Sequence, residues 1–269
     1  MFYKSKSSSI LSVNDPDPVN MINRHSISPF LIICDHAGKF IPEKLNNLGL
    51  EPNDLERHIA FDIGIKGVGK KLAKKLNATL ILQNYSRLVI DCNRNPNHEN
   101  LIIEISDKTV IKGNLDLSDE EKKSRVSSIY NSYHACIEQD IERRQNAQIS
   151  TCLIALHSFT PQMDNIERPW HAGILHDRYP EFGLIFKKYL ERYYEFPIGD
   201  NEPYRLNEKN DYSVPCHAFG RKLPYLELEI RQDLIRSEIQ QREWAVRLAY
   251  LLPLTLQEYG KDEYYNRKG

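Results

Sequence analysis

Short apolar runs that stop abruptly at polar side chains recur along the chain and predict buried strands. The runs are residues 31–34, 88–90, 152–156 and 225–230. The polar residues that follow them are Asp35 with His36, Asp91, His157 and Arg231, respectively. Open α/β sheets place ligands at the carboxyl ends of their parallel strands. We therefore predict that four strand ends bring two histidines, a carboxylate and an arginine to one place.

Helical periodicity separates these strands and indicates an α/β fold. Apolar positions three and four apart predict helices over about residues 65–76, 118–141, 181–194 and 237–259. Ser118 and Glu121 form the capping box that opens the second of these helices. Strands that alternate with helices predict a three-layer α/β fold, in which helices cover both faces of a mostly parallel or mixed sheet. We expect a flexible, loosely attached arm over residues 1–28, a single domain over 29–269 and an irregular excursion over 96–117.

Composition narrows the function classes. The 269 residues carry a formal net charge of -1 and contain no long basic run, which gives no electrostatic case for nucleic-acid binding. No apolar stretch is long enough to span a bilayer, and the polar N-terminus does not read as a secretory signal. Five widely spaced cysteines do not indicate a disulfide framework. We expect a cytoplasmic protein that binds neither nucleic acid nor membrane.

The polar residues at the strand ends offer ligands for a metal ion. Two histidines and a carboxylate leave one coordination position open, which suits catalytic zinc. The candidates are His36, His157 and either Asp62 or Glu43, whose wide spacing makes no compact motif. Glu229 is placed to take a proton from a zinc-bound water and to pass it to a leaving amine. These residues predict metal-assisted amide hydrolysis.

Arginines near the strand ends offer contacts for an anionic group. Arg87 and Arg94 bracket residues 88–90, and together with Asn93 they provide a fork for a substrate carboxylate. A surface arginine is more often simply solvated. Arg168 precedes another predicted strand, and both a substrate contact and an ordinary loop role are open for it.

Five segments resemble one known family, and they occur in the same order. They are DHAG (35–38, with Ile41 and Pro42 following), FDIG (61–64), YSRLVIDCNR (85–94), HSFTP (157–161) and ELEI (227–230). Together they are similar to the N-formylglutamate amidohydrolase family from about residue 30 to residue 250. The resemblance implies a phosphorylase/hydrolase-like α/β fold related to zinc carboxypeptidases. It also implies zinc-dependent hydrolysis of N-formyl-L-glutamate to formate and L-glutamate, the last step of histidine degradation.

Three of these regions also resemble zinc carboxypeptidases. The resemblance implies that His36 and His157 are metal ligands, that Glu229 is the general base, and that Asn93 and Arg94 grip the substrate carboxylate. Arg87 would contact the oxyanion or the substrate. Arg168 is a candidate substrate contact only from its position before a predicted strand.

The third metal ligand departs from the carboxypeptidase pattern. That pattern has a ligand glutamate close behind its first histidine, and this chain lacks one at that spacing. Asp62 belongs to the amidohydrolase motif and is therefore preferred to Glu43.

The resulting hypothesis is an amidohydrolase with one catalytic Zn²⁺ that acts on a small N-acyl amino acid, as a monomer or homodimer. A deacylase or carboxypeptidase-like hydrolase for another N-acyl amino acid or short peptide is the alternative within enzymes. From a different class, a catalytically inactive ligand-binding protein on the same fold would have the same sequence features.

Overall fold

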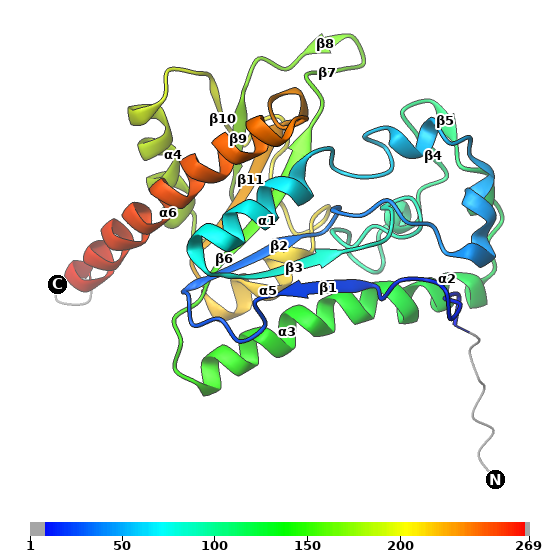
Figure 1. Cartoon of the computed structure of the whole chain (residues 1–269), viewed down its shortest axis with the longest axis horizontal. Helices are drawn as coiled ribbons and strands as arrows, with labels where there is room; N and C mark the ends of the chain where they lie inside the picture. The colour runs from blue at the N-terminus through cyan, green and yellow to red at the C-terminus, as the bar shows by residue number, and fades with distance from the viewer. Residues whose placement is uncertain (1–8, 267–269) are drawn as a thin grey trace.

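The central feature of the computed structural model, which describes residues 9–266, is a seven-stranded mixed sheet with helices on both faces (Figure 1). The strand order is β1-β3-β2-β6-β11-β9-β10. The strands are β1 (Val19–Ile22), β2 (Phe30–Cys34), β3 (Thr79–Gln83), β6 (Cys152–Phe159), β9 (Ala172–Leu175), β10 (Ile198–Asp200) and β11 (Tyr225–Arg231). This architecture confirms the predicted α/β fold.

The four strands β3, β2, β6 and β11 run parallel to one another in the middle of the sheet. Their carboxyl ends therefore lie at one edge, where residues that follow them can meet. β1 is antiparallel to β3, β9 is antiparallel to β11, and β10 is parallel to β9. Every residue of β2 and β3 is buried, as expected for strands covered on both faces.

The sheet separates the hydrophobic core into two layers, and helices cover each layer from outside (Figure 1). On one face lie α1 (Ile65–Leu76), α4 (Glu181–Tyr193) and α6 (Glu238–Asn266). On the other lie α2 (Asp119–Arg125), α3 (Asn131–Asn146) and α5 (Ser213–His217). Alternation along β6 sends Ile154 to the first layer and Ala155 to the second. His157 therefore emerges on the α3 and α5 side.

The helix that the capping box predicts is formed as expected. Ser118 accepts from the backbone N–H of Glu121, and the Glu121 side chain accepts from the N–H of Ser118. The helix continues from α2 through one π-helical turn, Val126–Tyr130, into α3. Two small hairpins lie outside the main sheet: β4 (Ile105–Ser106) with β5 (Thr109–Val110), and β7 (Gln162–Met163) with β8 (Ile166–Glu167). Within the described residues no helix is long and apolar enough to cross a bilayer.

Three expectations about the chain are wrong. Residues 88–90 are a buried turn rather than a strand, because Ser86 Oγ accepts from the N–H of Leu88 and the Ser86 carbonyl accepts from Val89. The prediction of a flexible arm over residues 1–28 is also wrong for residues 19–22, because they form β1, an edge strand that pairs with β3. Residues 1–8 of that arm lie outside the described residues. The four strand ends are therefore three strand ends and one turn. The predicted arginine, Arg231, also does not join the site, because it pairs with Asp233 and is not among the described residues that line the cavity.

Candidate metal centre and active site

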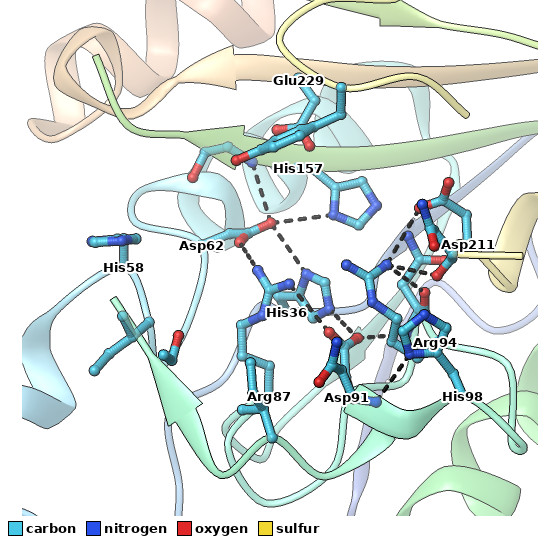
Figure 2. Close-up of a pocket in the computed structure, with 18 of the residues that line it drawn as sticks. His36, His58, Asp62, Arg87, Asp91, Arg94, His98, His157, Asp211 and Glu229 are labelled. Atoms are coloured by element: carbon cyan, nitrogen blue, oxygen red, sulfur yellow. Dashed lines mark hydrogen bonds and ion pairs between the residues drawn. The ribbon is translucent and has the colours of Figure 1, made fainter. Parts of the chain in front are cut away.

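His36, Asp62 and His157 meet at the carboxyl edge of the sheet. One ligand atom from each lies within 4.8 Å of the others, and all three residues are buried. Oδ2 of Asp62 is 3.5 Å from Nδ1 of His36 and 3.2 Å from Nδ1 of His157 (Figure 2). His36 follows β2, His157 is part of β6, and Asp62 precedes α1. The structure thus brings together the three residues preferred as metal ligands.

Backbone contacts hold this cluster in place. The N–H of Asp62 donates to the carbonyl of His36, and the N–H of Ser158 donates to Oδ2 of Asp62. Gly38 lets the loop after His36 approach the backbone of Asn84, because a Cβ on Gly38 would lie 1.8 Å from the Asn84 carbonyl oxygen. The Asp-His-Ala-Gly segment therefore needs glycine for close packing.

Glu43, the other candidate for the third ligand, is exposed and lies elsewhere. Its carboxylate accepts a hydrogen bond from Ser12 Oγ at 2.8 Å, and its backbone N–H donates to Asp15. The geometry therefore favours Asp62 over Glu43.

Two further carboxylates contact the ring nitrogens of His36 and His157 that do not face Asp62, and so orient the two imidazoles. Nε2 of His36 lies 2.6 Å from Oδ1 of Asp91, and Nε2 of His157 lies 3.3 Å from Oδ2 of Asp35. A carboxylate on the far nitrogen fixes the ring and makes the near nitrogen a better metal ligand. The sequence pattern indicates no such role for Asp35 and Asp91, although each lies inside one of the five segments quoted above.

Charged neighbours shift the pKa values of all three residues of the cluster. Burial alone would raise the pKa of Asp62, but His36, His157 and Arg87 outweigh it and hold that pKa well below its usual range. Burial and Arg87 lower the pKa of His36, yet the attraction of Asp91 and Asp62 is larger, so the pKa is raised. The pKa of His157 is raised well above its usual value because Asp35 and Asp62 outweigh its burial.

The donor set fits a zinc ion. Two imidazoles and one carboxylate are ligands typical of catalytic zinc sites. Nδ1 of His36 is buried and has no hydrogen-bond partner among the described residues, so this atom is available to a metal ion. The nearby carboxylates would lower the cost of bringing a dication into this buried place.

Glu229 lies next to the cluster on the neighbouring strand. It pairs in register with His157, so both side chains lie on the same face of the sheet. Its side chain is buried, and Oε2 has no hydrogen-bond partner among the described residues. Burial raises its pKa to about 7, against the opposing effect of His157. A carboxylate with such a pKa can accept and return a proton near neutral pH.

These residues open onto a cavity of about 650 Å³. His36, Asp62, His157 and Glu229 line it, and the arginines Arg87 and Arg94 lie along its wall (Figure 2). The predicted excursion also contributes to it, from His98 to Asp107. The cavity provides room for a small molecule beside the metal ligands.

The predicted anion-binding side chains already have partners within the protein. Arg87 contacts Asp62 at 3.3 Å and Asp91 at 3.1 Å. Arg94 donates to the carbonyl of Asn210 at 2.6 Å and lies 3.5 Å from Asp211. Both arginines still line the cavity.

Asn93 and Arg168 depart further from the expected carboxylate fork. Oδ1 of Asn93 accepts from the N–H groups of Tyr212 and Ser213, at the start of α5. Arg168 is not among the described residues that line the cavity; it donates to Tyr204 and Thr160 instead. Arg168 therefore supports the cavity wall through Tyr204.

Comparisons with known proteins bear on the family and the fold of this chain. Residues 28–236 match the model of a family described as N-formylglutamate amidohydrolase. The crystal structure of gene product Atu2144 from Agrobacterium tumefaciens is 31% identical, with a TM-score of 0.90 over 93% of this chain and 99% of that one. The N-formylglutamate amidohydrolase from Ralstonia eutropha JMP134 is 17% identical, with a TM-score of 0.63 over 94% and 100% of the two chains, and so shares the fold. No curated protein gave a significant match.

Proposed function

The chain belongs to the N-formylglutamate amidohydrolase family, and we propose that it hydrolyses the amide bond of an N-acyl amino acid with one bound zinc ion. The observation that carries this proposal is the buried group of His36, Asp62 and His157 with Glu229 on the adjacent strand. Two histidines, a carboxylate and a free buried carboxylate are the groups that metal-assisted hydrolysis requires.

Each residue has a separate role in the reaction. His36, Asp62 and His157 would hold the ion, which when bound supplies Lewis-acid chemistry to the amide carbonyl and to water. Glu229 takes a proton from the attacking water and passes it to the nitrogen that leaves when the C–N bond breaks. Arg87, beside Asp62 at the cavity wall, stabilises negative charge on the carbonyl oxygen. The products are a carboxylic acid and a free amino acid.

Other residues of the cavity wall would bind the substrate. Arg94 and Asn93 would meet the substrate carboxylate, Arg94 by its guanidinium and Asn93 by the side-chain amide nitrogen, because Oδ1 is engaged. Arg168 would contribute indirectly, through the Tyr204 side chain that it contacts.

N-formyl-L-glutamate, cleaved to formate and L-glutamate, is the first substrate to test because the family model has that name. A role in histidine degradation in the cytoplasm would follow from that substrate. A deacylase for a different N-acyl amino acid is the second candidate. It is favoured by one observation: of the three arginines among the described residues that line the cavity, Arg87 and Arg94 already have carboxylate partners, so Arg205 is the one left to meet a second anionic group.

Formate release from N-formyl-L-glutamate by the zinc-supplemented protein tests the proposal. We expect turnover that a chelator abolishes and added zinc restores. Turnover that survives complete removal of metal would contradict the role of the ion. If zinc-loaded protein hydrolyses no member of a panel of N-acyl amino acids, the inactive ligand-binding protein becomes the better description.

A further inference from the structure

The hydroxyl of Ser213 is a buried polar group beside the metal centre that the proposed reaction does not use. Ser213 is the first residue of α5 and is 1% exposed. Its Oγ donates to Oδ1 of Asp35 at 2.8 Å, although 178 positions separate the two residues in the sequence. Asp35 is equally buried, and its other oxygen, Oδ2, lies 3.3 Å from Nε2 of His157. One carboxylate therefore joins the hydroxyl to a proposed metal ligand.

The Ser213 hydroxyl makes this contact because another side chain caps the start of α5. A serine at the start of a helix usually accepts a hydrogen bond from the backbone of that helix. Here Oδ1 of Asn93 accepts from the N–H of Tyr212 at 3.0 Å and from the N–H of Ser213 at 2.9 Å. These two bonds fix the backbone of Ser213 and leave its hydroxyl to donate to Asp35. Any buried hydroxyl needs an acceptor, but this acceptor also contacts His157.

We propose that Ser213 is a positioning residue that acts through Asp35 to orient the imidazole of His157 for the metal ion. This inference rests on the metal centre of the proposed function. A carboxylate can rotate, and a hydrogen bond to one of its oxygens fixes the direction of the other. With Ser213 on Oδ1, Oδ2 stays directed at Nε2 of His157, and Nδ1 of that ring stays directed at Asp62. Without the hydroxyl, Oδ1 loses a charge-assisted hydrogen bond in a buried place, so the carboxylate turns and its hold on the ring weakens.

Ser213→Ala in the full-length protein tests this role. We expect a Kd for zinc about 3- to 10-fold higher, a smaller effect than the loss of a carboxylate that contacts the ligand directly. Competition with a chromophoric chelator measures it. The visible absorption bands of the cobalt-loaded protein should also change, because they report the arrangement of the ligands around the ion. Thr255→Ala is the control: Thr255 is also buried, but its Oγ1 donates to the Leu251 carbonyl within α6. Its Kd and its spectrum should equal those of the wild type.

A double-mutant cycle shows whether Ser213 acts through Asp35. Asp35→Ala removes the carboxylate that contacts His157, so the Kd for zinc should rise about 10- to 100-fold. In that background Ser213→Ala should change the Kd by less than about twofold, because the group that transmits its effect is gone. An undiminished effect of Ser213→Ala in that background, or an equal effect of Thr255→Ala, would overturn the inference.

The outcomes separate this inference from the proposed function. If Ser213→Ala binds zinc as tightly as the wild type and has the same cobalt spectrum, the positioning role is wrong and the hydrolase stands. If the wild type binds no zinc, the metal centre fails, and the imidazole NMR signals of His157 in the metal-free protein decide the inference. The same signals decide it if Asp35→Ala does not fold. A change in Ser213→Ala that Thr255→Ala does not show supports the role, and unchanged signals overturn it. Circular dichroism of each variant shows whether the fold is retained.

Discussion

Nε2 of His36 lies 2.6 Å from Oδ1 of Asp91, and both side chains are buried. The same carboxylate accepts from the backbone N–H of Asn93 and, through Oδ2, from Arg87. Asp91 therefore sits in a fixed position, and it leaves Nδ1 of His36 facing Asp62. Because the imidazole donates its proton toward Asp91, its other nitrogen keeps a lone pair for a metal ion.

Asp91→Asn should weaken zinc binding without unfolding the protein. The amide keeps the oxygen that accepts from Asn93, but it removes the negative charge that favours the metal-binding form of His36. We expect a Kd for zinc 10- to 100-fold higher, on the order seen when such partners are lost. Competition with a chromophoric chelator measures it.

The control for this variant is Asp116→Asn. Asp116 is exposed, and its positive φ of 53° is a backbone conformation that asparagine also adopts readily. Its zinc affinity should equal that of the wild type. An Asp91→Asn protein that binds zinc as tightly as the wild type would show that the contact does not tune the ligand.

Glu229→Gln should separate metal binding from catalysis. The substitution keeps the size of the side chain beside His157 but removes its ability to accept a proton, so kcat should fall by about 10²- to 10⁴-fold. Zinc content, measured by atomic absorption, should stay at one ion per chain because Glu229 is not among the proposed ligands. Activity close to that of the wild type would rule out Glu229 as the base.

The main part of the fold could be predicted from the sequence because its signals are local. The runs that become β2, β6 and β11 are apolar over most of their length. His36 follows β2, whereas His157 and Glu229 lie within β6 and β11. Residues 88–90 are equally apolar but form a turn, because Ser86 satisfies two of their backbone N–H groups. Periodicity alone cannot separate a buried turn from a short buried strand. β1 was missed because its Asn20 and half-buried residues gave no strand pattern.

Pairings between distant residues were the part of the site that sequence could not supply. The contacts of Asp35 with His157 and of Ser213 with Asp35 join segments more than 100 residues apart. The engagement of Arg94 by Asp211 likewise depends on a loop whose course no local pattern fixes. The residue types at the site could therefore be predicted from the sequence. The sequence could not predict which of these side chains lack a protein partner and can contact a ligand.

His134 and His217 form a buried pair that should make stability depend on pH. Their rings stack, with Nδ1 of His134 3.0 Å from Nε2 of His217. Burial lowers the pKa of His134 to about 3 and that of His217 to about 4. Since both values lie below the ordinary 6.5, the stability that comes from neutral rings is complete above pH 6.5. It is lost progressively as the pH falls from there toward the folded-state values.

His217→Gln tests this pH dependence. Between pH 7.5 and pH 5 the wild type should lose about 2 kcal/mol more of its unfolding free energy than the variant, because the variant lacks one of the two protonation sites. Urea unfolding at the two pH values, with the same zinc concentration, measures the difference. Exposed His25 provides the control, as His25→Gln should follow the wild type. Equal losses in the wild type and in His217→Gln would show that this pair does not control acid stability.

Arg144 and Arg143 offer a matched test of what holds α3 against the sheet. Both contact Asp140, but the Arg144 side chain is fully buried whereas that of Arg143 is 28% exposed. Arg144 also donates to the carbonyls of Ser28 and Phe30, at the start of β2. Arg144→Met would leave those acceptors without a donor, so we expect a loss of about 3–5 kcal/mol in unfolding free energy. Arg143→Met should cost about 1 kcal/mol or less, because water replaces its contacts. Urea denaturation followed by circular dichroism compares them, and equal losses would mean that burial of Arg144 adds nothing.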